Sequence, residues 1–130
     1  MASTRILICG GRDFDDWPFV RDNLDRIVFE REWIISSEDG NWLANVEVIH
    51  GGARGVDHLA DHWAATNWCT IHEFKAEWDK YGKSAGFKRN TRMLVEGKPD
   101  LVVAFPGGKG TAMMVDIARK AGVEVIEIGS

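Results

Sequence analysis

The chain has 130 residues, of which 45% are hydrophobic and 28% charged, and its formal net charge is −4. This length and composition predict one globular domain over residues 1–130. The negative charge argues against a protein that binds nucleic acid by bulk electrostatics, and the sequence shows neither a signal peptide nor a transmembrane run. The two cysteines, Cys9 and Cys69, have no metal-like spacing, so we expect a reduced cytoplasmic protein with no metal site and no membrane partner.

Short apolar runs alternate with stretches of helical spacing along the whole chain. The runs predict strands at residues 5–9, 46–50, 70–74, 100–105 and 123–128. Helices are expected at about 16–32, after Gly55, from about 86 to 95, and after Thr111, whereas 36–45 and 76–85 are expected to be loops. This order predicts an α/β fold, a Rossmann-like three-layer α/β/α sandwich with a five-stranded parallel sheet.

Three of the predicted strands run directly into glycine turns, at residues 10–12, 50–55 and 106–111. Because the carboxyl ends of parallel strands share one edge, the three turns should converge there. With the strand order 3-2-1-4-5, the ligand crevice lies between the first and fourth strands. The third turn opens a helix, whose free N–H groups and partial positive charge favour a phosphate.

Two familiar nucleotide-binding signatures are incomplete. Gly82-Lys83-Ser84 resembles the end of a P-loop, but Glu77 stands where that signature requires a glycine. The dinucleotide fingerprint ending at Gly55 fails because His50 occupies its first glycine position. Neither signature therefore identifies the ligand.

Charged side chains on the predicted helices allow two interpretations. Arg89 and Arg92 are three apart and should share a helix face, either as a phosphate clamp together with Lys88 or as a solvated surface. His58 and His62 are four apart on the helix after Gly55, off its apolar stripe. Asp57 and Asp61 also lie off that stripe, and without a suitable third ligand a solvated face is expected there rather than a metal site.

The segments His50–Asp57, Ala85–Met93 and Pro106–Thr111 together carry a family resemblance. They resemble the SLOG superfamily and, more closely, its small YspA-like branch, over nearly the whole chain. The superfamily includes the Lonely Guy phosphoribohydrolases and the DNA-processing protein DprA/Smf. The resemblance implies a Rossmann-like fold that binds nucleotides or nucleotide-derived ligands, often as a homo-oligomer.

The chain departs from the Lonely Guy motif at one position. Those enzymes carry P-G-G-x-G-T-x-x-E, and Met114 stands here in place of the glutamate that serves cleavage of the N-glycosidic bond. Asp116 lies about 200° around the helix from that position, so it should not simply replace it. The resemblance also implies an upstream catalytic arginine, for which Arg89 and Arg92 are both candidates.

Two functions remain open from the sequence. In the first, the protein is a sensor or sequestering module for a nucleotide such as an ADP-ribose or NAD-like molecule, held as a ligand and with no other cofactor. In the second, it is an N-glycosidase acting on nucleoside 5′-monophosphates, with Asp57 or Asp116 as the carboxylate. A DprA-like role with single-stranded DNA is disfavoured, because the chain is acidic and lacks an extended aromatic and basic track.

The predicted ligand-binding residues come from the glycine turns and from side chains near them. Arg12, Arg54 or Arg89 should hold phosphates, Asp57 a ribose hydroxyl, and Trp78 should stack on a base. The full set is Gly10, Gly11, Arg12, His50, Gly51, Gly52, Arg54, Gly55, Asp57, Trp78, Arg89, Asn90, Pro106, Gly107, Gly108, Lys109, Gly110 and Thr111.

Overall fold

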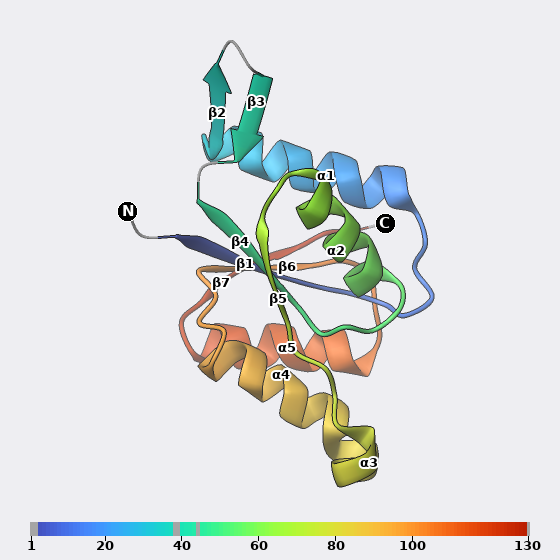
Figure 1. Ribbon diagram of the computed structural model, residues 1–130. Coiled ribbons are helices and arrows are strands. Elements are labelled where there is room, and N and C mark those ends of the chain that lie inside the picture. The colour runs from blue at the N-terminus through green and yellow to red at the C-terminus, as the bar shows by residue number, and fades with distance from the viewer. Residues whose placement is uncertain (1–2, 38–39, 44, 130) are drawn as a thin grey trace.

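A parallel sheet forms the centre of the protein, and helices cover both of its faces (Figure 1). The computed structural model describes residues 3–37, 40–43 and 45–129. The sheet has five strands in the order β5-β4-β1-β6-β7, all parallel, which confirms the predicted fold class. Counted along the five strands, this is the order 3-2-1-4-5, for which a crevice between the first and fourth strands is expected. Its strands are β1 (Thr4–Cys9), β4 (Val46–His50), β5 (Thr70–Glu73), β6 (Leu101–Ala104) and β7 (Glu124–Glu127).

Four long helices form the two outer layers. On one face lie α1 (Trp17–Glu30) and α2 (Val56–Thr66), and on the other lie α4 (Ala85–Val95) and α5 (Lys109–Lys120) (Figure 1). Their starts follow from local chemistry: the Asp16 carboxylate caps α1 by accepting from the Phe19 amide at 3.2 Å, and Pro18 lies in its first turn.

Alternation along β1 divides the core into two halves. Ile6 and Ile8 pack with α1 and α2, whereas Leu7 and Cys9 pack with α4 and α5. This is the period-2 alternation of a strand buried on both faces, and β6 is apolar and buried throughout for the same reason. The edge strands β5 and β7 are less buried, as the alternation in residues 70–74 predicts for β5.

Two segments predicted as loops contain regular structure. Within residues 36–45, the described part belongs to an antiparallel hairpin of β2 (Ile34–Ser37) and β3 (Gly40–Leu43), which projects beyond the sheet beside the end of α1 (Figure 1). Residues 38, 39 and 44 lie outside the described part. Within residues 76–85, α3 (Trp78–Tyr81) is followed by a 3₁₀ turn (Gly82–Ser84). The sequence did not predict these elements, because both segments are polar. A short hairpin and a single helical turn also contain too few residues to show a hydrophobic periodicity.

Across the described residues, no helix combines the length and the apolar character that crossing a bilayer requires.

The three glycine turns pack directly on one another at the carboxyl edge of the sheet. The Gly11 amide donates to the Pro106 carbonyl at 2.8 Å, and the Gly11 carbonyl accepts from the Val56 amide at 3.1 Å. Gly55, with φ of +77°, has no room for a side chain, because a Cβ there would collide with the Gly11 carbonyl oxygen. The backbone of one turn thus holds the other two in place.

Replacing Gly55 by alanine should therefore destabilise the fold more than the same change at Gly122. Both glycines have positive φ, a conformation that strains any residue with a side chain, so both variants should lose stability. Only Gly55→Ala adds a steric collision, which should cost about 1–3 kcal/mol more, because a Cβ at Gly122 meets open space. Urea unfolding of both variants measures the difference, and equal losses would contradict tight packing between the turns.

Candidate functional site

A cavity of about 380 Å³ opens at the carboxyl edge of the sheet, next to the glycine turns. The carboxyl end of β1 and the first turn of α5 form one side of the cavity. The other side is formed by α3, the 3₁₀ turn and α4. Its lining residues are Cys9, Gly10, Gly11, Arg12, Ala53, Asp57, Trp78, Lys83, Gly86, Phe87, Arg89, Asn90, Met93, Gly108, Lys109, Gly110 and Thr111. The lining combines an apolar floor with four cations and one carboxylate.

The first turn of α5 brings backbone donors to this cavity. Gly108 is the N-cap and has no side chain, so no capping group occupies the amides that follow it. Gly108, Lys109, Gly110 and Thr111 all line the cavity. The Asn90 side chain fixes this turn from α4, because its Nδ2 donates to the Gly110 carbonyl at 3.0 Å. An uncapped helix start held in this way is suited to an anion.

Arg89 lies between the second glycine turn and the cavity. Its Nη1 donates to the Gly51 carbonyl at 2.5 Å, and its Nε donates to Asn90 Oδ1 at 3.0 Å. Burial lowers the pKa of the Arg89 guanidinium, while the nearby Asp57 carboxylate opposes that shift. Arg89 is therefore a positioned, partly desolvated cation at the cavity wall.

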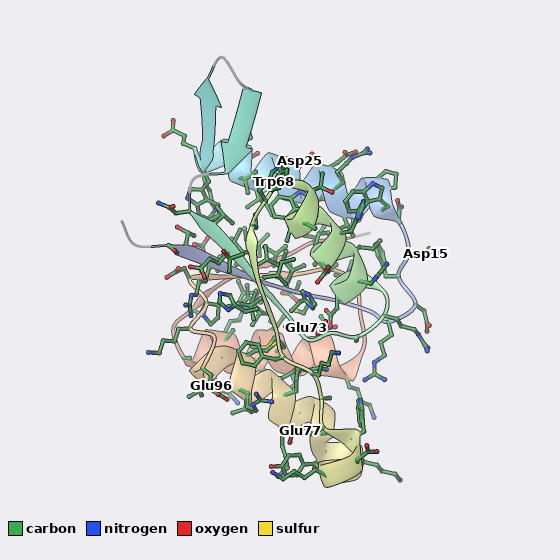
Figure 2. The ribbon with its side chains drawn as sticks, viewed as in Figure 1. Asp15, Asp25, Trp68, Glu73, Glu77 and Glu96 are labelled. Carbon is green, nitrogen blue, oxygen red and sulfur yellow. The ribbon has the colours of Figure 1, made fainter. Side chains whose placement is uncertain are left out.

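The expectation that Arg92 shares the clamp face with Arg89 is wrong. Arg92 is absent from the cavity lining and instead pairs with Glu96 at 3.0 Å, with its guanidinium over the Phe74 ring. Glu96 follows the last residue of α4, at the end of this helix away from α3 (Figure 2). Residues three apart on a helix diverge by about 60°, which is enough to direct one side chain inward and the other along the surface.

Asp57 is buried rather than solvated, which corrects the expectation for this residue. It lies in the first turn of α2, with only 7% of its surface exposed, and its Oδ2 accepts from the Ala53 amide at 3.2 Å. Burial raises the pKa of the Asp57 carboxyl, and the Ala53 amide and the Arg89 charge oppose the rise. The hydrophobic pattern of α2 did not predict this burial, because Asp57 is covered by the turn that precedes the helix and not by the core.

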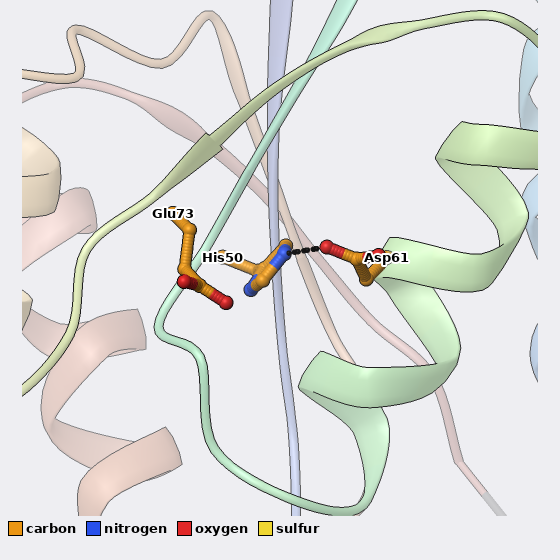
Figure 3. A group of neighbouring side chains, drawn as sticks. All are labelled: His50, Asp61 and Glu73. Carbon is orange, nitrogen blue, oxygen red and sulfur yellow. Dashed lines mark hydrogen bonds and ion pairs between the residues drawn. The ribbon is translucent and has the colours of Figure 1, made fainter.

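His50 lies at the end of β4, next to the second glycine turn (Figure 3), and it is not among the residues that line the first cavity. Its Nδ1 accepts from the Gly52 amide at 3.0 Å, so the proton resides on Nε2, which donates to Asp61 Oδ2 at 2.7 Å. The Glu73 carboxylate lies on the opposite side of the ring from Asp61 (Figure 3). Ligand atoms of His50, Asp61 and Glu73 lie within 4.8 Å of one another. Both ring nitrogens of His50 already have hydrogen-bond partners, and the contact with the Gly52 amide stabilises the second glycine turn.

The two histidines of α2 that the sequence paired as possible ligands lie in different surroundings. His58 is exposed, and His62 is packed edge-on against Trp17 with ring centroids 4.6 Å apart. Neither residue belongs to the cluster around His50.

Trp78 lies at the cavity mouth together with Arg12. The Arg12 guanidinium is 5.2 Å from the centre of the Trp78 ring, within cation–π range, and Trp78 is 47% exposed. These two side chains come from α3 and the first glycine turn. They also border a second, more open cavity of about 460 Å³ above the second glycine turn.

Most of the predicted binding residues gather at these cavities. The first cavity contains eleven of them: Gly10, Gly11, Arg12, Asp57, Trp78, Arg89, Asn90, Gly108, Lys109, Gly110 and Thr111. Gly51, Gly52 and Arg54 border the second cavity. His50 and Gly55 lie behind the turns in supporting positions, and Pro106 and Gly107 border a separate recess on the far side of the third turn.

Sequence reasoning missed six residues of the first cavity: Cys9, Ala53, Lys83, Gly86, Phe87 and Met93. Cys9 and Met93 belong to the buried core, and burial raises the pKa of the Cys9 thiol to about 12, so it lines the floor as an apolar group. Lys83 lies in the 3₁₀ turn, and Gly86 and Phe87 lie in the first turn of α4. The incomplete P-loop ending at Ser84, which fails as a signature, is the one sequence feature that could have drawn attention to this segment.

The position that carries glutamate in Lonely Guy enzymes is part of the core here. Met114 has no exposed surface and packs in the cluster that contains Leu7 and Cys9. Asp116 is on the solvent side of α5, where it pairs with Lys120 at 3.0 Å, and it is absent from the cavity lining. Of the two fallback carboxylates, only Asp57 faces the cavity.

Two comparisons with known proteins bear on this site. The family model described as "YspA, cpYpsA-related SLOG family" matches residues 4–81, a segment that contains the first two glycine turns and Trp78. The "Gene 61 protein" of Mycobacterium phage D29 is 34% identical over 139 aligned positions, which cover 96% of this chain and 96% of that protein.

Asp57→Asn should change how stability depends on pH. Because burial raises the carboxyl's pKa in the folded state, folded protein retains a proton that unfolded protein releases, and this contribution to stability falls as pH rises above the ordinary aspartate value of 3.8. Asparagine keeps an acceptor for the Ala53 amide and removes this fall. We expect urea unfolding between about pH 4 and 7 to show the variant gaining stability relative to the parent as pH rises.

Asp116→Asn is the matched control for this measurement, because it removes an exposed carboxylate outside the cavity. If the difference in unfolding free energy between Asp57→Asn and the parent stays constant across this pH range, the pKa of Asp57 is not raised by burial.

Proposed function

Because the chain belongs to the YspA, cpYpsA-related SLOG family, we propose that it binds a nucleotide or nucleotide-derived ligand at the carboxyl edge of its sheet, as a sensor or sequestering module. The observation that carries the proposal is the cavity in which the uncapped start of α5 meets Arg12, Lys83, Arg89 and Lys109. In a chain of net charge −4, this local excess of cations favours an anionic ligand.

The parts of the cavity suit the parts of a nucleotide. Backbone amides of Lys109, Gly110 and Thr111 are directed as donors for a phosphate, with Arg89 as a fixed counter-charge. The half-exposed Trp78 and Phe87 rings offer flat surfaces for a base. Asp57 supplies an acceptor for a ribose hydroxyl. A homo-oligomeric state and a cytoplasmic location stay predictions.

Gly108→Val should abolish nucleotide binding without unfolding the protein. A Cβ at Gly108 meets no atom within 4 Å and its φ is −100°, so a β-branched side chain fits the fold but fills the space in front of the α5 amides. Calorimetric titration with AMP measures the loss, after mass spectrometry of small molecules released from denatured protein has identified any ligand carried from the cell.

Gly129→Val is the matched control, because Gly129 also has open space around its Cβ and lies outside the cavities. Unchanged AMP affinity in Gly108→Val, with an intact thermal transition, would remove the third glycine turn from the binding site.

A second candidate function is hydrolysis of the N-glycosidic bond of a nucleoside 5′-monophosphate. The observation that favours it is the Asp57 carboxyl, which faces the cavity near Arg89 and whose pKa is raised by burial. A carboxyl of raised pKa is suited to general acid–base work. Against it stands Met114, buried where the hydrolases of the superfamily carry glutamate.

We expect turnover of AMP to be absent or very slow, because loss of a transition-state carboxylate costs orders of magnitude in rate. Chromatography of AMP incubated with the protein measures free adenine. Rapid release of adenine that Asp57→Asn abolishes would instead establish the hydrolase, with Asp57 as its carboxylate.

A further inference from the structure

The second cavity differs in chemistry from the first. It lies above the second glycine turn, between that turn and the segment that leads from β5 to α3. Its lining is Arg12, Gly51, Gly52, Ala53, Arg54, Lys75, Ala76, Trp78 and Arg89. This set contains four cations, one aromatic ring and small residues, and no carboxylate. A concave surface of this composition suits a small anion rather than a base.

The two cavities share one wall. Arg12, Ala53, Trp78 and Arg89 border both, so the stacked pair of Arg12 and Trp78 stands where one cavity passes into the other. Arg89 is held in this wall by the Gly51 carbonyl and Asn90, whereas Arg12 is fully on the surface side and rests on the ring. A ligand that occupies both cavities would contact the Arg12 and Arg89 guanidinium groups at the place where the two cavities meet.

The charges around the two cavities exceed what one phosphate needs. Lys83 and Lys109 belong to the first cavity alone, Arg54 and Lys75 to the second alone, and Arg12 and Arg89 to both. Only Asp57 among the lining residues opposes these six cations. Within the described part of the chain, Arg12, Lys83 and Lys109 form no ion pair. Arg54 pairs with Asp13 at 3.1 Å and Lys75 pairs with Glu73 at 3.6 Å, but the Arg54 and Lys75 side chains are each 75% exposed, so both pairs are weak and an anion can displace them.

We propose that the two cavities are subsites for one ligand, a nucleotide that carries a second anionic group, with the nucleoside phosphate in the first cavity and the second anion over the Gly51–Arg54 turn. This inference rests on the proposed function and specifies its ligand class. Arg12 and Arg89 bridge the two anions, and Arg54 and Lys75 hold the outer one. A nucleotide with a single phosphate occupies the first cavity and leaves the second to solvent.

Paired variants test the assignment, with AMP and ADP-ribose as calorimetric probes of one and two anionic groups. Arg54→Ala/Lys75→Ala removes cations from the second cavity alone, and Lys83→Ala/Lys109→Ala is the matched control in the first. All four side chains are exposed, so both double variants should fold. We expect the parent to bind ADP-ribose more tightly than AMP. Arg54→Ala/Lys75→Ala should weaken ADP-ribose by about tenfold or more and change AMP by less than about twofold, whereas the control weakens both probes.

Three outcomes would overturn the inference. If Arg54→Ala/Lys75→Ala leaves ADP-ribose affinity within about twofold, the second cavity holds no part of the ligand. If the double variant lowers the affinities for AMP and ADP-ribose equally, Arg54 and Lys75 act only through the long-range electrostatic field of the protein and not by contact with a second anion. Both of these results leave the proposed nucleotide binding intact. If the parent binds neither probe, the proposed function fails and the two-subsite inference fails with it.

Discussion

The backbone of Gly11 is the junction on which the candidate site depends. Its amide donates to the Pro106 carbonyl at the end of β6, and its carbonyl accepts from the Val56 amide at the start of α2. Three turns that are far apart in the sequence are therefore joined at one residue. The approach is close enough that a Cβ at Gly10 would lie 2.5 Å from Val56 Cγ2, so Gly10 has no room for a side chain against α2.

Around this junction, buried and half-buried polar side chains hold the second turn in place. His50 accepts from the Gly52 amide, Asp57 accepts from the Ala53 amide, and Arg89 donates to the Gly51 carbonyl. Every one of these contacts engages a backbone group of the second turn. Since a buried backbone group without a partner is costly, the side chains stabilise the turn and orient it toward the cavity at the same time. Arg89 and Asp57 thus contribute both to the fold and to the charge of the site.

Position 114 belongs to the hydrophobic core of this protein, whereas Lonely Guy enzymes carry a glutamate at the matching position. Met114 fills space against Leu7 and Cys9 where a hydrolase carries a carboxylate. An unpaired carboxylate there would lose its hydration without gaining a partner, so an apolar side chain is the stable choice at this buried position. Met93 and Cys9 extend the same apolar cluster to the floor of the first cavity.

The sequence by itself determined the five strands of the parallel sheet, the convergence of the glycine turns and the family, because hydrophobic period and turn chemistry are local properties. It did not reveal the hairpin of β2 and β3. It also identified Arg12, Trp78 and Arg89 as candidates. Only the tertiary structure decided that Arg92 turns away to Glu96, that Asp57 is buried and that His50 supports the turn from behind. Side-chain direction and burial depend on what packs across from a residue, and contacts between distant segments leave no periodic trace in the chain.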